Sequence, residues 1–234
     1  MSDSKVTWVT FDCYGTLIDW EGGMAAFLYA IALRSGDDSP PPGNTLRREW
    51  EAIQFDLIQG PYKPYTRVLA ESLRAWCKTR DFPYIEAYDQ AVVASMRAFQ
   101  PFHDTKPALE RAQQSGLNLA IISNTDHDII CHSLNHMGIE FEEVITAEDC
   151  GAYKPASTVF EQALDRLDVP AEQVLHVAFG FKYDIGPAQQ LGWETAWVNR
   201  NAEHLSGNVE PGHIWRDLWG LAAFAGAPYV LEKP

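Results

Sequence analysis

The sequence predicts an α/β fold, a Rossmann-like doubly wound parallel sheet with a helical cap inserted after the first strand. Three observations predict it. A buried strand near the N-terminus ends in an acidic residue, the following segment has only helical periodicity, and the remainder alternates short strands with helices. Repeated strand–helix units form a parallel sheet with helices on both faces. We therefore expect a core domain at residues 1–18 and 101–234 and a cap domain at residues 19–100.

The first strand is expected over residues 5–12. Apolar residues dominate it, and valine and threonine are frequent, which is typical of a strand buried on both faces. It ends in Asp12, and Gly15 marks a turn just beyond. Open parallel sheets bind their ligands beyond the carboxyl ends of their strands. Asp12 is therefore a candidate functional residue.

The cap is expected to be helical and to contain no strand. Apolar residues recur there at three- and four-residue spacing, and proline or glycine separates the periodic stretches. The expected cap helices lie at 24–33, 46–58, 68–76 and 85–99.

After residue 107 the pattern alternates between strand and helix. The expected strands lie at 118–123, 141–147, 174–178 and 195–199, and the expected helices at 128–137, 157–167 and 184–191. All strands of a parallel sheet end at the same edge. Ser123, Lys154 and Asp184, which follow three of the strands, should therefore meet near Asp12.

The bulk composition limits the possible partners. The 234 residues are 46% hydrophobic and 21% charged, as in a globular protein, and the net charge of -14 disfavours nucleic acid as a partner. No apolar run is long enough to span a bilayer, and the N-terminus lacks a signal-peptide pattern. We expect a cytoplasmic protein without a membrane partner, and a homodimer is possible.

The polar motifs at the strand ends resemble those of the haloacid dehalogenase (HAD) superfamily. The matching segments are FDCYGTL at 11–17, ISN at 122–124, YKP at 153–155 and the run that ends in Asp184. The resemblance covers essentially the whole chain and places the helical insert where this superfamily has its cap. It implies that Asp12 is a covalent nucleophile.

The residue types fit that chemistry. A carboxylate can attack an electrophilic carbon or phosphorus and form an ester intermediate. Lys154 would keep Asp12 ionised through its charge. Thr16 and Ser123 can donate hydrogen bonds to Asp12 or to a substrate carboxylate. Asp184 could pair with Lys154 and orient the water that hydrolyses the ester.

Two substitutions disfavour a Mg²⁺-dependent phosphatase. Phosphatases of this superfamily carry a second Asp two residues after the nucleophile, where this chain has Tyr14. They also carry an Asp five residues before the last motif Asp, where this chain has Phe179. A phenyl ring offers no oxygen to a hard cation. We therefore expect neither a metal nor another cofactor.

The YGTL segment at 14–17 resembles the L-2-haloacid dehalogenase branch, which is metal-free. In that branch the Asp displaces a halide from carbon, and water then hydrolyses the ester. The resemblance implies that Asn124 and a cap arginine contact the small carboxylate substrate. Arg47 and Arg48 both lie near the matching position, and we weight Arg47 slightly higher.

The segment before the last motif departs from this branch. Phe179 and Phe181 stand where hydroxyl or amide residues are usual, and together with Tyr14 and Trp20 we expect them to line the pocket. Aromatic faces suit a compact cation better than an anion. Hydrolytic ring opening of L-azetidine-2-carboxylate, a variation within this branch, is therefore held nearly equal to dehalogenation. A catalytically idle fold kept for binding is a further alternative, against which the retained motifs argue.

Overall fold

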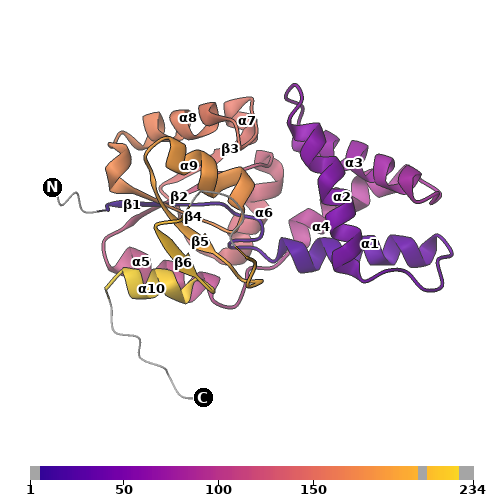
Figure 1. The fold of residues 1–234 in the computed structure, drawn as a ribbon, viewed down its shortest axis with the longest axis horizontal. Coiled ribbons are helices and arrows are strands. Elements are labelled where there is room, and N and C mark those ends of the chain that lie inside the picture. The colour runs from indigo at the N-terminus through magenta and orange to yellow at the C-terminus, as the bar shows by residue number, and fades with distance from the viewer. Residues whose placement is uncertain (1–5, 205–209, 227–234) are drawn as a thin grey trace, which may run out of the picture.

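The computed structural model describes residues 6–204 and 210–226 (Figure 1). Among these residues six strands form one sheet in the order β3-β2-β1-β4-β5-β6, and every neighbouring pair is parallel. The strands are β1 (Trp8–Phe11), β2 (Asn118–Ser123), β3 (Glu143–Thr146), β4 (Val174–Ala178), β5 (Glu194–Val198) and β6 (His213–Trp215). The predicted α/β fold with a parallel sheet is confirmed. Lys5, the expected start of the first strand, lies outside the described residues.

Helices cover both faces of the sheet (Figure 1). On one face pack α5 (Thr105–Gln114), α6 (His127–Met137) and α10 (Trp219–Phe224), and on the other α8 (Ser157–Leu167) and α9 (Gly186–Gln190). Successive side chains of a strand point to opposite faces. Leu119 and Ile121 accordingly belong to the apolar cluster with α5, α6 and α10, whereas Ala120 and Ile122 belong to the cluster with α8 and α9. This explains why the strands are apolar throughout.

Four further helices stand to one side of the sheet (Figure 1). They are α1 (Trp20–Arg34), α2 (Gly43–Ile58), α3 (Tyr65–Thr79) and α4 (Ala87–Ala98), called the cap helices below. The apolar cluster on the α5 side of the sheet continues into them through Trp50 and Leu69. Asp126, in the loop after β2, accepts hydrogen bonds from the backbone N–H of Tyr65 at 2.7 Å and of Thr66 at 2.9 Å. A core residue thus holds the start of α3.

Several short elements differ from the sequence-based expectation. The pattern did not indicate α5 or β6, and a π-helix at Phe181–Ile185 begins before the helix expected at 184–191. Two short helices, α7 (Ala147–Cys150) and a 3-10 turn at Ala171–Gln173, were not expected either. Apart from the ten-residue α5, these elements have at most 5 residues and are too short to show a periodicity of their own.

The strand order reverses at β1, which lies between β2 and β4. Crevices at such a reversal are where doubly wound sheets bind ligands. The backbone N–H of Asp12 still donates to the carbonyl of Val177 at 3.1 Å, so Asp12 directly continues the pairing of β1 with β4.

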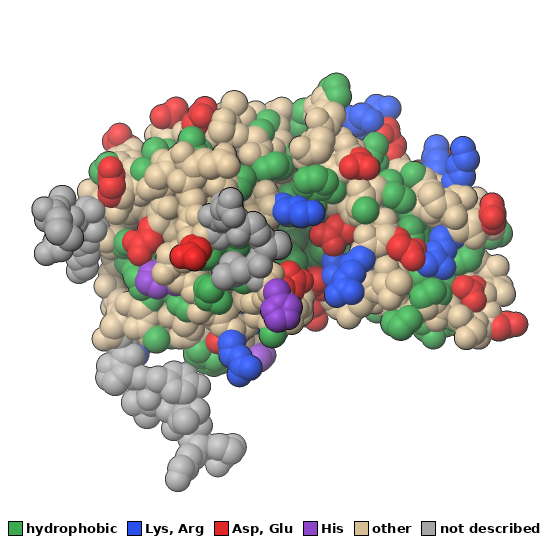
Figure 2. Space-filling view, in the orientation of Figure 1, with side chains coloured by type: hydrophobic (Ala, Val, Ile, Leu, Met, Phe, Trp, Pro, Cys, Tyr) green, Lys and Arg blue, Asp and Glu red, His purple; other side chains and the backbone are tan. Residues whose placement is uncertain are grey.

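The described surface is mixed in charge. On the face drawn in Figure 2, acidic side chains occur throughout, and most Lys and Arg side chains lie over or next to the cap helices. As far as residues 6–204 and 210–226 go, this face shows no continuous basic stripe. None of the helices in these ranges is both long and apolar enough to cross a membrane.

Candidate active site

A small cavity of about 60 Å³ lies at the carboxyl edge of the sheet, next to the cap helices. The core contributes the polar residues that follow its strands. They are Asp12, Ser123, Asn124, Lys154 and Asp184, and the ring of Phe179 lines the cavity beside them. The sequence-predicted residues from the four motifs are therefore brought to one cavity, as expected for strands that end at the same edge.

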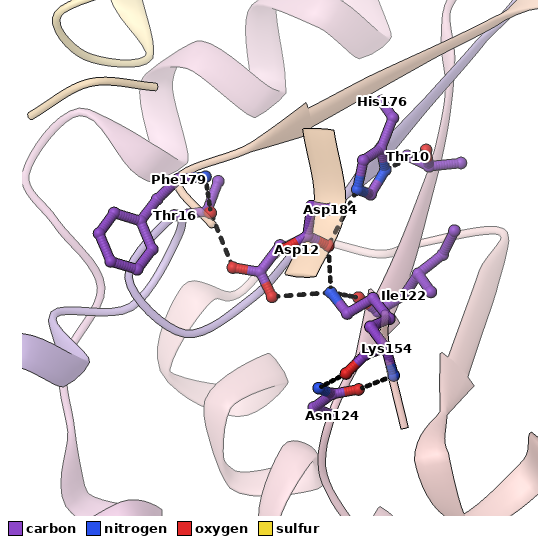
Figure 3. A network of polar contacts seen from close by, with 9 residues as sticks. All are labelled: Thr10, Asp12, Thr16, Ile122, Asn124, Lys154, His176, Phe179 and Asp184. Carbon is purple, nitrogen blue, oxygen red and sulfur yellow. Dashed lines mark hydrogen bonds and ion pairs between the residues drawn. The ribbon is translucent and has the colours of Figure 1, made fainter. Parts of the chain in front are cut away.

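Asp12 is held by one donor on each carboxylate oxygen (Figure 3). Lys154 Nζ donates to Oδ1 at 3.0 Å, and Thr16 Oγ1 donates to Oδ2 at 2.8 Å. Thr16 in turn accepts the backbone N–H of Phe179 at 2.8 Å, so its hydroxyl proton is directed at Asp12. Thr16 is buried beside the nucleophile and does not line the cavity.

The turn after Asp12 requires glycine. Gly15 has φ of 95°, and a Cβ there would lie 2.6 Å from Cδ1 of Phe179. Only glycine combines that backbone conformation with so close an approach. Gly15 therefore allows the Phe179 ring to sit against the nucleophile loop.

Lys154 is almost completely buried, and its ammonium group uses all three of its N–H donors. Nζ donates to Asp12 Oδ1 at 3.0 Å, to Asp184 Oδ1 at 2.5 Å and to the carbonyl of Ile122 at 2.7 Å. Asn124 fixes the backbone of Lys154 through two bonds, accepting its N–H at 2.7 Å and donating to its carbonyl at 2.9 Å. Asn124 thus positions the lysine loop as well as lining the cavity.

Asp184 receives a second donor that the sequence analysis did not single out. His176 Nε2 lies 3.1 Å from Asp184 Oδ1, and His176 Nδ1 lies 2.8 Å from Thr10 Oγ1 (Figure 3). An ionised carboxylate can only accept, so Nε2 carries a proton and donates to Asp184. The feature of the sequence that could have indicated this role is a histidine inside the otherwise apolar strand β4.

The three central charges perturb one another. Burial and the charge of Asp184 raise the pKa of Asp12, while Lys154 opposes that rise. Burial also acts on Asp184, but Lys154 and His176 outweigh it and lower the pKa of Asp184. Burial acts to lower the pKa of Lys154, yet the two carboxylates raise it overall. Lys154 is therefore protonated and Asp184 ionised at neutral pH.

The cap helices supply the opposite wall of the cavity. Their lining residues are Trp20, Glu51, Gln54, Ile58 and Tyr65. Gln54 Nε2 donates to the Tyr65 hydroxyl at 2.8 Å. Of these residues the sequence analysis named only Trp20, because the packing of helices α2 and α3 decides which of their faces meets the core.

The cap arginines do not line the cavity in this structure. Arg47 is buried behind its wall, where it pairs with Glu21 and, at 2.5 Å, with Glu51, and its guanidinium lies 5.4 Å from the centre of the Trp20 ring. Arg48 is exposed. Glu21 and Glu51 neutralise the guanidinium of Arg47 in this arrangement, and its expected contact with a substrate carboxylate stays a prediction.

Aromatic rings form much of the remaining lining. Tyr14, Phe179 and Tyr183 line the cavity, and the Tyr14 hydroxyl lies 2.9 Å from Ser133 Oγ. Phe181 does not line it and instead packs against Trp197, with ring centres 5.4 Å apart. Phe181 and Tyr183 lie about half a turn apart in the π-helix and therefore point in different directions. The sequence analysis anticipated neither this irregular helix nor the role of Tyr183.

Ser123 presents an unsatisfied hydroxyl. Its side chain is 2% exposed and lines the cavity, and Oγ has no hydrogen-bond partner among the described residues. Buried polar atoms are normally paired, so an unpaired one at a cavity wall points to a ligand. Ser123 is available to donate to a substrate carboxylate.

Comparisons with known proteins agree with this geometry. A family model described as haloacid dehalogenase-like hydrolase matches residues 6–192. An (S)-2-haloacid dehalogenase of Pseudomonas putida is 27% identical over 90% of this chain and 92% of its own length. Haloacetate dehalogenase H-2 of a Moraxella species is 24% identical over 84% of this chain and 87% of its own length. The solved L-2-haloacid dehalogenase RSc1362 superposes with a TM-score of 0.82 at 26% identity, covering 95% of this chain and all of the other. The chain belongs to the haloacid dehalogenase-like hydrolases.

Proposed function

We propose that the protein hydrolyses small 2-substituted carboxylates through a covalent ester on Asp12, as a 2-haloacid dehalogenase does. The observation that carries the proposal is the placement of Asp12 in the cavity, between Lys154 and Thr16 and with Asp184 on the far side of Lys154. The relatives named as 2-haloacid dehalogenases support the substrate class.

In the first step an oxygen of Asp12 forms a bond to C2 of the substrate. The bond from C2 to the leaving group breaks, and its electron pair departs with that group. The unpaired hydroxyl of Ser123 donates to the substrate carboxylate. Holding the two reactants in line in this way supplies much of the rate acceleration.

In the second step water attacks the ester carbonyl of Asp12. Asp184 accepts the proton of that water, and the developing oxyanion on Asp12 is stabilised by Lys154 and Thr16. The carbonyl reforms as the bond to the oxygen of the 2-hydroxy acid breaks, and this oxygen takes the proton held by Asp184. Loss of the remaining water proton to solvent restores the Asp12 carboxylate with one oxygen from water.

The proposed reaction requires no metal, and the side chains that line the cavity are consistent with a metal-free reaction. Lys154 already places a positive charge between Asp12 and Asp184, at 3.0 Å and 2.5 Å. The Phe179 ring lines the cavity where an oxygen ligand would be needed for Mg²⁺. Among residues 6–204 and 210–226, no three His, Cys, Asp or Glu side chains cluster as a metal site would require.

Two leaving groups fit this chemistry. Halide is favoured by the named relatives. The ring nitrogen of L-azetidine-2-carboxylate is favoured by the aromatic lining from Tyr14, Trp20 and Phe179, since ring faces attract cations. Breaking the strained C–N bond would give 2-hydroxy-4-aminobutyrate.

A substrate panel tests the proposal. The parent protein is incubated with L- and D-2-chloropropionate, fluoroacetate and azetidine-2-carboxylate, and the halide and the hydroxy acid are measured. Turnover of at least one compound is expected, and Asp12→Asn should abolish it, whereas Asp165→Asn on the exposed surface should not. Absence of turnover with every compound would favour a binding protein of the same fold.

A further inference from the structure

We propose that Glu51 receives a positively charged group of the substrate, so that the site prefers a zwitterionic, amino-acid-like carboxylate to a simple anion. This inference rests on the proposed function and names the substrate class of the same cavity. It follows from the charges that line the cavity.

The lining is strongly acidic. Asp12, Glu51 and Asp184 carry three carboxylates, and Lys154 is the one cationic side chain among the described residues that line the cavity. Its three donors are all used within the protein. A substrate that is only an anion therefore meets an excess of negative charge on the cavity wall.

The charges behind the cap wall do not change this balance. Arg47 lies between Glu21 and Glu51, so that one cation faces two carboxylates there as well. Arg47 is 4% exposed and does not line this cavity. Glu51 is the member of this trio that lines the cavity together with Asp12.

Glu51 has an oxygen left for a ligand. Arg47 donates to Oε2, and the described residues give Oε1 no hydrogen bond. Burial raises the pKa of Glu51, and the charge of Arg47 partly offsets that rise. A substrate cation would complete its pairing.

The cavity offers complementary groups for such a substrate. Ser123 presents its unpaired hydroxyl on the core side for the substrate carboxylate, and Glu51 lies on the cap side, with the Trp20 ring also lining the cavity. Burial raises the pKa of Tyr183, and the charges of Glu51 and Asp12 add to that rise. Glu51 and Asp12 line the same cavity, so a small molecule bound there can contact Glu51 while it reacts at Asp12.

A matched pair of substrates tests the inference independently of the leaving group. The pair is 2-chloropropionate and 3-amino-2-chloropropionate, which react at the same carbon and differ by one ammonium group. We expect Glu51→Gln to lower kcat/KM for the amino compound about tenfold, because a charge-assisted hydrogen bond is lost. The same change should raise kcat/KM for 2-chloropropionate, because a like charge is removed.

Two further variants serve as controls. Glu49→Gln makes the same substitution on the same helix at an exposed residue that pairs with Arg80. It should not change kcat/KM for either of the two substrates. Glu51→Asp keeps the charge and should retain the preference for the amino compound. Equal changes for both substrates in Glu51→Gln would overturn the inference.

Binding of unreactive analogues separates this inference from the proposed function. Propionate and 3-aminopropionate lack a leaving group, and calorimetry compares their affinities for the parent protein and for Glu51→Gln. Tighter binding of 3-aminopropionate that depends on Glu51 supports the inference even if no chloride is released from any substrate. Equal affinities for the two analogues, or no binding of either, contradict it even if turnover is observed.

Discussion

His176 Nε2 lies 3.1 Å from Asp184 Oδ1, on the same oxygen that Lys154 contacts at 2.5 Å. With Oδ1 bonded twice, Oδ2 is left toward Gly180, whose Cβ position would lie 2.6 Å from it. Gly180 lines the cavity, so Oδ2 is the oxygen that can reach a water there. His176 thus acts as a positioning residue for the proposed base.

Replacing His176 should slow hydrolysis of the ester more than its formation. We expect His176→Leu to lower kcat about tenfold, an effect typical of removing a group that orients a catalytic one. The ester should then accumulate as an added mass on the Asp12 peptide. Because Thr10 loses its partner, stability should fall by about 1–3 kcal/mol, and adding Thr10→Val should recover much of it without restoring kcat. Recovery of both together would show a structural role only.

Gly180 provides a separate probe of Asp184. Alanine at this position would press on Oδ2, and we expect Gly180→Ala to reduce the ester hydrolysis rate while leaving the fold intact. Gly186→Ala is the matched control, since its Cβ would meet only an ordinary contact of 3.7 Å with the Phe181 carbonyl. Single-turnover kinetics measure both variants. Equal rates in the two variants would contradict the assignment of Oδ2.

Removing Lys154 should cost stability as well as activity. Lys154→Met leaves Asp12 and Asp184 buried without a cation, and breaking a buried pair in this way costs about 3–5 kcal/mol. Urea unfolding at neutral pH measures the loss. The deficit should shrink as the pH is lowered and the two carboxylates become protonated. A deficit that does not depend on pH would mean that lost packing, not charge, is responsible.

The pH dependence follows from Asp12. Burial raises its pKa above the ordinary value of 3.8, and only the ionised form attacks carbon. We expect kcat/KM to fall as the pH drops through this raised pKa.

Stability changes with the opposite sign. The folded state binds the Asp12 proton more tightly than the unfolded state, so the contribution of Asp12 is most favourable below about 3.8 and is lost as the pH rises through the folded pKa. Asp12→Asn should therefore be more stable than the parent above that window. Thermal unfolding from acid to neutral pH measures the difference, and a less stable Asn variant at neutral pH would contradict the raised pKa.

The fold and the core side of the cavity could be predicted because they depend on local sequence. Asp12, Ser123, Lys154 and Asp184 follow strands, and the ends of parallel strands meet at one edge whatever the details of packing. The order of strand and helix also appears directly in the apolar pattern. These features do not require any knowledge of tertiary contacts.

The cap side could not be predicted in the same way. Glu51 and Tyr65 line the cavity because of how α2 and α3 pack against the core. The start of α3 is fixed by Asp126, which follows Tyr65 by 61 residues along the chain. Arg47, which the sequence analysis expected at the substrate, pairs with Glu21 and Glu51 in the structure. The pair with Glu51 has the four-residue spacing of one helix, but the pair with Glu21 depends on how α1 packs against α2, which the sequence pattern does not contain.

Isotope labelling tests the covalent role of Asp12 most directly. Enzyme in excess over 2-chloropropionate is allowed a single turnover in H₂¹⁸O, and both the hydroxy acid and the Asp12 peptide are then weighed by mass spectrometry. Water that attacks the Asp12 carbonyl leaves ¹⁸O in the peptide, while the first product carries ordinary oxygen from Asp12. Label found in the product and absent from the peptide would mean that water attacks the substrate carbon itself, and that Asp12 is not the nucleophile.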